Sequence, residues 1–547
     1  MMLLKGTAWL ISMAGWVGFF AGLGSGWAAP LTAACSVSLI LYAAGLVGLL
    51  QPCAWLLLVC GLFLLIRLLL QKKLGRLFPE FCLMAAAGAL LWLRYRSALL
   101  VAYDDFSHWG MIVQRMLTTH AFPAAEDRLI AFQSYPPGAA CWLYDAGLFL
   151  GGSDGMLLTL QSWLVLAGIW PLFGAAEGKN AWWKRIGMAG VLLVFLSLYQ
   201  GTASLMVDNL LPAVAVGALS TGLLLQRQKE ERGLWMVGIQ LAQLCMIKDS
   251  GLFFAAAVLV LLLAARRLKG RKTGLKDGIA LLLPALAARC LWLLHIKLAF
   301  PAAGVSRHAL TLENLRRTGG QKSFEEMLSI GKSLLERMLS PDNLVLQMVA
   351  LSLMIGLFEA FRRKAGKKEK RQACLLPLAE AVIALAYGVG LWGMYIFSMP
   401  GSGAGNLAAF ERYNSSCALF LYGVTALWLM GKPSEDKGWT ATSVLALCAV
   451  LLIPAWRSGV PRLFQENYHV PLRYTMEELR DERPLQPGEE AVLLVDGDEY
   501  VSFASYMARY VFQSPDIRVE QSVSENQNAV IYDARRKNAS EETEEQP

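Results

Sequence analysis

Two adjacent carboxylates, a histidine and a tryptophan lie together in the segment YDDFSHWG, residues 103–110. The segment follows an apolar run, 81–102, that is long enough to cross a lipid bilayer. Charged side chains at the edge of a membrane are costly and are usually retained for function. One carboxylate of such a pair suits a general base that takes a proton from a hydroxyl group, while its neighbour tunes the first or orients a substrate. Asp104 and Asp105 are therefore the candidate catalytic residues, although a pair of solvated loop acids is the alternative.

Three rings in the same loop are candidates for substrate binding. His108 and Trp109 follow the acid pair, and such rings can bind the face of a sugar or a phosphate group. Tyr135 precedes Pro136 and Pro137, which can hold it as a rigid wall of a site. Each ring also has a structural alternative, since a single histidine is often structural and proline is common in the first turn of a helix.

Three charged residues lie where later apolar runs begin or turn: Asp208 in VDNLLP, Lys248 in IKDSG and Arg412 in FERYNS. Asp208 can cap a helix, and Lys248 can extend its ammonium group to the membrane surface. Lys248 and Arg412 can instead bind the phosphate of a lipid. All three are retained as candidate substrate-binding residues.

The elements that must position these residues are membrane helices. The chain has 547 residues, of which 56% are apolar, and its mean hydropathy is +0.44. Apolar runs of the length that crosses a bilayer recur along most of it, which predicts an all-α polytopic membrane protein with about 12–14 transmembrane helices. The expected spans lie near 8–28, 31–50, 54–70, 81–102, 154–175, 186–200, 205–225, 234–247, 251–265, 277–296, 342–361, 374–397, 411–430 and 440–457. The first is interpreted as a retained span rather than a cleaved signal peptide.

Basic residues indicate the orientation of these spans. They collect in short loops that the order of spans places on one face: 71–76, 179–185, 226–232, 266–276 and 362–371. This face is predicted to be cytoplasmic. The loops 103–153 and 297–341 then lie outside the plasma membrane, together with the candidate site. Because the positive charge is explained by topology, it does not indicate nucleic-acid binding.

Several segments between the spans have patterns of their own. Residues 136–152 form an apolar stretch of about 16 residues that contains Asp145, so we expect a helix in or near the outer interface, preceded by the amphipathic stretch 109–120. The runs 234–247 and 251–265 are short and predict a helical hairpin with Lys248 at its tip. A second interfacial helix is expected at 323–339.

The composition changes after the last span. Residues 458–547 carry nine Lys and Arg against eighteen Asp and Glu. Their pattern predicts strand, helix, strand and strand, and hence a small α/β unit outside the membrane that leans on the helices. The expected domains are additional N-terminal helices at 1–75, a transmembrane catalytic domain at 76–457, the α/β unit at 458–536 and a disordered acidic tail at 537–547.

Several common motifs are missing from the sequence. None of the ten cysteines forms a CxxC pair, and they are interpreted as packing residues rather than metal ligands or disulfides. Gly331-Lys332-Ser333 lacks the leading glycine of a P-loop, GSGAGN lacks the last glycine of a dinucleotide motif, and HExxH does not occur. The sequence therefore predicts no cofactor and no metal site, and it disfavours a soluble nucleotide-sugar donor.

The order of these features resembles the GT-C superfamily of polyprenyl-phosphate-sugar-dependent glycosyltransferases, as in protein O-mannosyltransferases and aminoarabinose transferases. That family has an acidic pair with a nearby His and aromatic residue in its first large external loop, then a Pro-Pro segment, an Asp before Leu-Leu and a hairpin with Lys at its tip. The matching residues lie within about 81–270: Asp104, Asp105, His108, Trp109, Pro136, Pro137, Asp208, Leu210, Leu211 and Lys248.

The resemblance implies an extracytoplasmic active site in which Asp104 is the general base and Asp105 supports it. An acceptor hydroxyl, on a glycan, a lipid or a protein, would attack the anomeric carbon with inversion and release polyprenyl phosphate. Family members differ in their metal requirement, so a divalent metal is compatible with the resemblance although none is predicted.

Two other functions remain as alternatives. A ligase or polymerase of lipid-linked surface polysaccharide would also work outside the membrane, but it would depend on external arginines more than on the acid pair. A transporter or flippase is favoured only by Arg67 and Arg289 within apolar runs, since neither an internal repeat nor paired broken helices are evident.

Overall fold

The computed structural model describes residues 2–72, 78–176, 182–199, 203–229, 233–300, 312–361, 367–431, 470–497, 500–522 and 529–535. Its first half contains α1 (Met2–Leu23), η1 (Gly26–Ala28), α2 (Ala29–Gly45), α3 (Leu50–Leu70), α4 (Phe78–Tyr95), η3 (Asp105–Trp109), α5 (Gly110–Thr119), α6 (Gly138–Leu150), α7 (Asp154–Ile169), η4 (Trp170–Ala176), α8 (Trp182–Ser197), α9 (Leu210–Gln228), α10 (Leu234–Ile247) and α11 (Gly251–Leu268). Its second half contains α12 (Leu275–Ala299), α13 (Leu312–Gly319), α14 (Phe324–Met338), α15 (Leu344–Phe361), α16 (Lys367–Phe397), α17 (Gly401–Gly405), α18 (Phe410–Met430), α21 (Val470–Glu482), β1 (Ala491–Leu494), α22 (Val501–Phe512), β2 (Ile517–Glu520) and β3 (Val530–Asp533).

Within the described residues, nine helices are long and apolar enough to cross a membrane. They are α1, α2 with η1, α3, α7 with η4, α9, α11, α12, α15 and α16. The spans expected at 81–102, 186–200 and 234–247 are shorter apolar helices, and the span expected at 411–430 is α18. The span expected at 440–457 and the acidic tail lie outside the described residues. The predicted class, a helical polytopic membrane protein with a small C-terminal α/β unit, is confirmed.

The helix that leads to the acid pair ends earlier than its apolar run. The run predicted a span to residue 102, but α4 ends at Tyr95. The carbonyl oxygen of Tyr95 approaches the start of α7 so closely that a Cβ atom on Gly155 would lie 2.0 Å from it. The backbone N–H of Leu100 then donates to Asp154 Oδ2 over 3.0 Å. The last residues of the run therefore form a packed loop rather than membrane helix.

The helix predicted to lie in the outer interface is instead part of the core. Helix α6 packs against α1, α2, α5, α7 and α10, and all its residues from Gly138 to Gly147 are buried. The carboxylate of Asp145 accepts a hydrogen bond from Trp9 Nε1 over 2.8 Å. The additional N-terminal helices thus cover a face that the apolar pattern of α6 could not distinguish from a lipid-facing one.

The other two expected surface elements have the predicted secondary structure. Helices α10 and α11 are separated only by residues 248–250 and pack against each other as a hairpin. Helix α14 begins at a capping box made by Ser323 and Glu326, and it buries Ile330 and Leu334 against its neighbours. Large apolar side chains along its other face, including Phe324 and Leu328, are exposed. This pattern is the one expected of a helix at a lipid interface.

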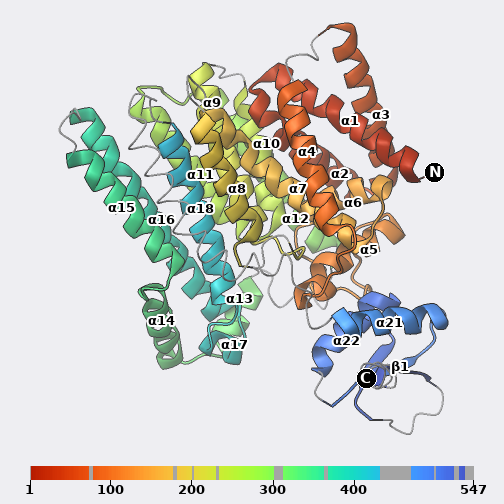
Figure 1. The fold of residues 1–547 in the computed structure, drawn as a ribbon. Helices are drawn as coiled ribbons and strands as arrows, with labels where there is room; N and C mark the ends of the chain where they lie inside the picture. The colour runs from red at the N-terminus through yellow and green to blue at the C-terminus, as the bar shows by residue number, and fades with distance from the viewer. Residues whose placement is uncertain are drawn as a thin grey trace, which may run out of the picture.

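The C-terminal unit contains a parallel sheet of three strands in the order β2-β1-β3. Helix α22 connects β1 to β2, as the sequence pattern predicted, and packs on the sheet. Helix α21 was not predicted, because its polar and apolar residues give too weak a signal over one short segment. Figure 1 shows this unit at one end of the helix bundle, the same end at which α13, α14 and α17 lie.

Candidate active site

The acid pair begins one turn of π-helix. Element η3 runs from Asp105 to Trp109 and continues directly into α5, and π-turns of this kind occur often at functional sites. Gly110 stands where the two meet, and a Cβ atom there would lie 2.9 Å from the carbonyl oxygen of Asp105 and 2.7 Å from Leu100. The absence of a side chain at Gly110 therefore permits the close packing that places Asp104 and Asp105.

Asp104 points toward charged residues from distant parts of the chain. Its carboxylate accepts a hydrogen bond from Arg412 Nη1, and Arg412 Nε lies 3.5 Å from Asp208 Oδ2. The other oxygen of Asp208 lies 3.5 Å from Lys248 Nζ. Arg412 belongs to the first turn of α18, Asp208 precedes α9, and Lys248 is at the tip of the α10–α11 hairpin. The structure thus brings four of the predicted site residues into one network of alternating charge.

The ring of Tyr413 lies beneath both cations of this network. Its centroid is 5.1 Å from the guanidinium carbon of Arg412 and 5.2 Å from Lys248 Nζ, and its hydroxyl accepts a hydrogen bond from Arg412 Nη2 over 3.2 Å. Cation–π contacts of this kind hold the two charges in place. Tyr413 was not among the predicted site residues, and its position next to Arg412 was the only signal in the sequence.

The charges of the network remain partly accessible. The side chain of Asp104 is 27% exposed, that of Arg412 17% and that of Lys248 16%, whereas that of Asp208 is only 8% exposed. Asp104 and the two cations can therefore contact a bound molecule. The buried Asp208 orients Arg412 and Lys248 by pairing with both.

Asp105 has a different environment from its neighbour. Its side chain is fully buried, and Oδ1 accepts hydrogen bonds from Ser204 Oγ over 3.0 Å and from the backbone N–H of Leu205 over 2.9 Å. Burial raises the pKa of Asp105 to about 8, against the effect of these two hydrogen bonds. Asp105 therefore anchors the segment before α9, and of the two predicted catalytic residues only Asp104 has an accessible carboxylate.

The raised pKa of Asp105 gives a first testable prediction. Because the pKa in the folded protein lies above the ordinary value of 3.8, the neutral carboxyl stabilises the fold below about pH 4, and this contribution is lost as the pH rises to about 8. Asn can accept the same two hydrogen bonds and does not titrate. We expect the melting temperature of the detergent-solubilised protein to fall between these pH values, and Asp105→Asn to reduce that fall. Equal falls in both proteins would contradict the assignment.

His108 lies inside a group of aromatic rings. Its ring centroid is 4.5 Å from that of Trp109, 4.8 Å from Tyr135 and 5.9 Å from Phe132. Burial, reinforced by the nearby charge of Lys248, lowers the pKa of His108 to about 3, so its imidazole is neutral at physiological pH. The predicted role in substrate binding stays a prediction, and this environment disfavours a role for His108 as a charged phosphate ligand.

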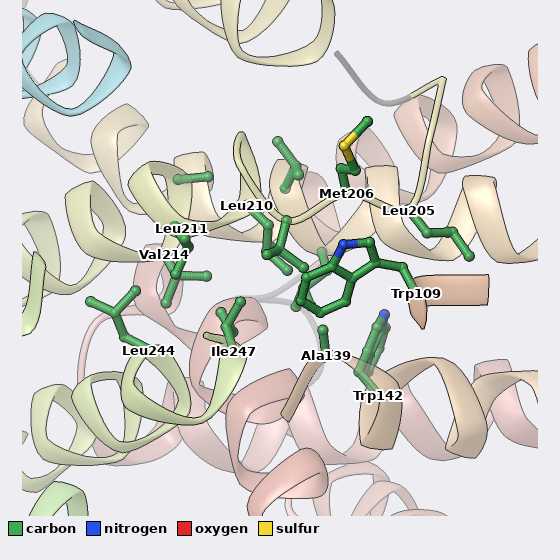
Figure 2. Close-up of a cluster of buried hydrophobic side chains, with 14 of the residues drawn as sticks. Trp109, Ala139, Trp142, Leu205, Met206, Leu210, Leu211, Val214, Leu244 and Ile247 are labelled. Carbon is green, nitrogen blue, oxygen red and sulfur yellow. The ribbon is translucent and has the colours of Figure 1, made fainter. Parts of the chain in front are cut away.

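Trp109 contributes to the hydrophobic core beneath the site. Its side chain points among apolar residues of α6, α9 and the segment before α9, including Ala139, Leu205 and Leu210 (Figure 2). Only 8% of the residue is exposed. The predicted contact of Trp109 with a sugar stays a prediction, and its indole ring contacts the rings of His108 and Tyr135. Trp109 therefore fixes η3 against the bundle.

Tyr135 lies between the aromatic group and the charged network. It stacks on Phe132 with ring centroids 5.1 Å apart. Burial, reinforced by the nearby Tyr413, Asp249 and Asp104, raises the pKa of its hydroxyl. The turn that carries it is held by a hydrogen bond from Trp292 Nε1 to the carbonyl oxygen of Ser134 over 3.2 Å. This is the position of a wall beside the network, although no ligand contact tests it.

The two charges within apolar runs that favoured a transporter are Arg67 and Arg289. Arg289 on α12 forms an ion pair with Asp249 at the tip of the hairpin, at 2.5 Å. Arg67 lies in the last turn of α3 and is exposed. The pairing of Arg289 and the exposure of Arg67 add no support to the transporter alternative, which stays untested.

In the part of the chain that the structure describes, no three His, Cys, Asp or Glu side chains form a group that could hold a metal ion. The four charged residues of the network include only two carboxylates, and each of them is paired with a cation of the chain itself. The charge of both carboxylates is therefore balanced by Arg412 and Lys248.

Comparison with solved structures finds ArnT from Cupriavidus metallidurans in two states. The structure bound to undecaprenyl phosphate is 16% identical, with a TM-score of 0.40 over 83% of this chain and 89% of that chain. The apo structure is 14% identical, with a TM-score of 0.41 over 82% of this chain and 88% of that chain. No protein-family model and no curated protein matches the sequence. Two structures of ArnT are thus among the structural neighbours of the chain.

Proposed function

We propose that the protein is an integral membrane glycosyltransferase that moves a sugar from a polyprenyl-phosphate donor to an acceptor hydroxyl. The observation that carries the proposal is the meeting of one accessible carboxylate, Asp104, with two accessible cations, Arg412 and Lys248, from segments far apart in the sequence. This set supplies a base for the incoming hydroxyl and positive charge for the departing phosphate.

The arrangement of the two cations suits a phosphate group. Arg412 and Lys248 each contact a different oxygen of Asp208, at 3.5 Å in both cases. A phosphate presents several oxygens, so one group can engage both cations from the accessible side. Their positive charge would stabilise the negative charge that develops on the phosphate as the bond to the sugar breaks.

These positions are compatible with the following reaction. The acceptor hydroxyl attacks the anomeric carbon while Asp104 takes its proton, the bond from that carbon to the phosphate oxygen breaks, and polyprenyl phosphate leaves. Attack from the side opposite the phosphate inverts the configuration. The positive-inside pattern of the loops favours an extracytoplasmic site, where a lipid-linked sugar requires no nucleotide.

The test is transfer of radiolabelled sugar in membranes that contain the protein, with polyprenyl-phosphate sugars and nucleotide sugars compared as donors. Transfer from the lipid-linked donors alone is expected. Transfer from a nucleotide sugar, with none from the lipid-linked donors, would refute the proposal.

Lys248→Met supplies a prediction for the phosphate site in the same assay. Loss of a charged hydrogen-bond donor costs about 1.5–3 kcal/mol, so the donor KM should rise about 10- to 100-fold. Lys332→Met is the matched control, because Lys332 is an exposed lysine of α14 that pairs only with Glu336 among the residues described. An unchanged KM in Lys248→Met would remove this residue from the donor site.

A further inference from the structure

The C-terminal unit is joined to the acid-pair segment by a buried polar junction. Asp154, the first residue of α7, is at its centre. Its Oδ2 atom accepts a hydrogen bond from the backbone N–H of Leu100, four residues before Asp104, and lies 3.2 Å from Arg473 Nη2 of α21. Its Oδ1 atom accepts a hydrogen bond from the hydroxyl of Tyr510 on α22 over 2.6 Å.

The same two C-terminal residues contact the π-turn itself. Phe106 is fully buried, and its ring centroid lies 5.3 Å from that of Tyr510 and 5.7 Å from the guanidinium carbon of Arg473. Arg473 also lies over the ring of Tyr510 at 4.9 Å. Gln114 of α5 donates a hydrogen bond to the Tyr510 hydroxyl over 3.3 Å. Arg473 and Tyr510 of the C-terminal unit therefore hold the segment 100–114 at both ends, through Asp154 at Leu100 and directly at Gln114.

This junction has features that distinguish it from ordinary packing. Arg473 is 4% exposed, and a charged side chain is buried at a unit boundary only at considerable cost unless it is paired. Arg473 pairs with the carboxylates of Asp154 and Glu477. It also lies over the aromatic rings of Phe106, within the π-turn, and Tyr510. A side chain needed only to attach the unit could be apolar. The planar guanidinium instead fixes the orientation of Phe106 as well as the position of Asp154.

We propose that Arg473 and Tyr510 are positioning residues that hold Asp104 in its reactive orientation, so that the C-terminal unit is part of the catalytic apparatus. They do not reach the charged network and act through Asp154 and Phe106. The inference rests on the proposed glycosyltransferase function. A displacement of about 1 Å in a reacting group can lower a rate by about 100-fold, so small changes at the junction should have large effects.

The experiment compares the full-length protein with Arg473→Met and Tyr510→Phe in the sugar-transfer assay. We expect kcat to fall about 10- to 100-fold in Arg473→Met, with the donor KM within about two-fold of the wild type, because Arg412 and Lys248 are untouched. Tyr510→Phe, which removes only the hydroxyl, should show a smaller fall. Arg473→Lys should recover part of kcat, since it restores the charge facing Asp154. Arg480→Met is the matched control, because Arg480 lies on the same helix and pairs with the adjacent Asp481.

Hydrogen–deuterium exchange provides the readout that a merely structural role would not produce. In Arg473→Met, exchange should rise in residues 97–110 and stay unchanged in β1, β2 and β3. A wild-type kcat in Arg473→Met, or a fall accompanied by equal loss of protection across the sheet, would overturn the proposal. If the wild type transfers no sugar from lipid-linked donors, the proposed function fails. Hydrogen–deuterium exchange still tests the junction in that case. Unchanged protection of residues 97–110 in Arg473→Met would show that the junction does not hold this segment.

Discussion

Asp104→Asn is expected to lower the rate of sugar transfer by about 100- to 10,000-fold, the usual contribution of a general base. Asparagine has nearly the same shape as aspartate, and its carbonyl oxygen can still accept the hydrogen bond from Arg412. It cannot take the proton of the acceptor hydroxyl. The variant should therefore fold normally and bind the donor with a KM close to that of the wild type, while kcat falls.

Asp127→Asn is the matched control for this substitution. Asp127 lies in the same loop, residues 103–153, and also forms an ion pair with an arginine, Arg115, at 2.9 Å, but it is not part of the charged network. Its replacement should leave transfer close to the wild-type rate. The assay uses radiolabelled sugar on polyprenyl phosphate, with expression of each variant checked by immunoblotting. Transfer at the wild-type rate in Asp104→Asn would reject Asp104 as the base and favour a ligase or polymerase that depends on external arginines.

The two acids illustrate what adjacent residues can and cannot reveal. Sequence alone identified Asp104 and Asp105 as a pair, and the family resemblance implied that Asp104 is the base and Asp105 its support. The π-turn rotates them in different directions, so that Asp104 faces Arg412 while Asp105 is buried against the segment at 204–205. Burial then makes Asp105 a weak acid with a pKa of about 8. A helical turn of unusual geometry cannot be read from the residue types, so the different environments of the two side chains required the structure.

The helices were predictable where hydropathy determines them. Long apolar runs predicted α1, α3, α12 and α15 correctly, because a span of about 20 apolar residues has few alternatives. Helix α6 was assigned to the interface, because an apolar pattern does not say whether lipid or other helices cover it. The early end of α4 also depends on a tertiary contact, the hydrogen bond between Leu100 and Asp154.

The charged network was predictable in its members but not in its pairing. Asp208, Lys248 and Arg412 were each selected as an isolated charge next to an apolar run. That Arg412 pairs with Asp104 follows from a contact across 308 positions in the sequence, which no local pattern encodes. Tyr413 was missed as a site residue for the same reason, since its role arises from the two cations that converge on its ring.

Arg412→Met should have the second large effect, because Arg412 has two tasks. It is expected to bind the donor phosphate, and it neutralises Asp104 and Asp208, both of which it contacts. Loss of one partner from a partly buried charge pair costs about 2–5 kcal/mol, or roughly 30- to 4,000-fold in affinity or rate. We expect the donor KM to rise and kcat to fall together. Arg412→Lys should restore only part of either, since an ammonium group cannot contact two carboxylates as a planar guanidinium does.

A double variant separates the role of Arg412 in binding from its role in stability. Arg412→Met leaves Asp208 buried next to a single cation, Lys248, so its melting temperature should be lower than that of the wild type. Adding Asp208→Asn removes the excess negative charge, so that one carboxylate, Asp104, and one cation, Lys248, remain; it should recover the melting temperature but cannot restore a phosphate ligand, so transfer should stay low. Arg337→Met is the control, because Arg337 pairs with Glu411 at the start of the same helix and is exposed. Recovery of transfer in the double variant would show that Arg412 serves the fold alone, and the phosphate would then have to be bound without it.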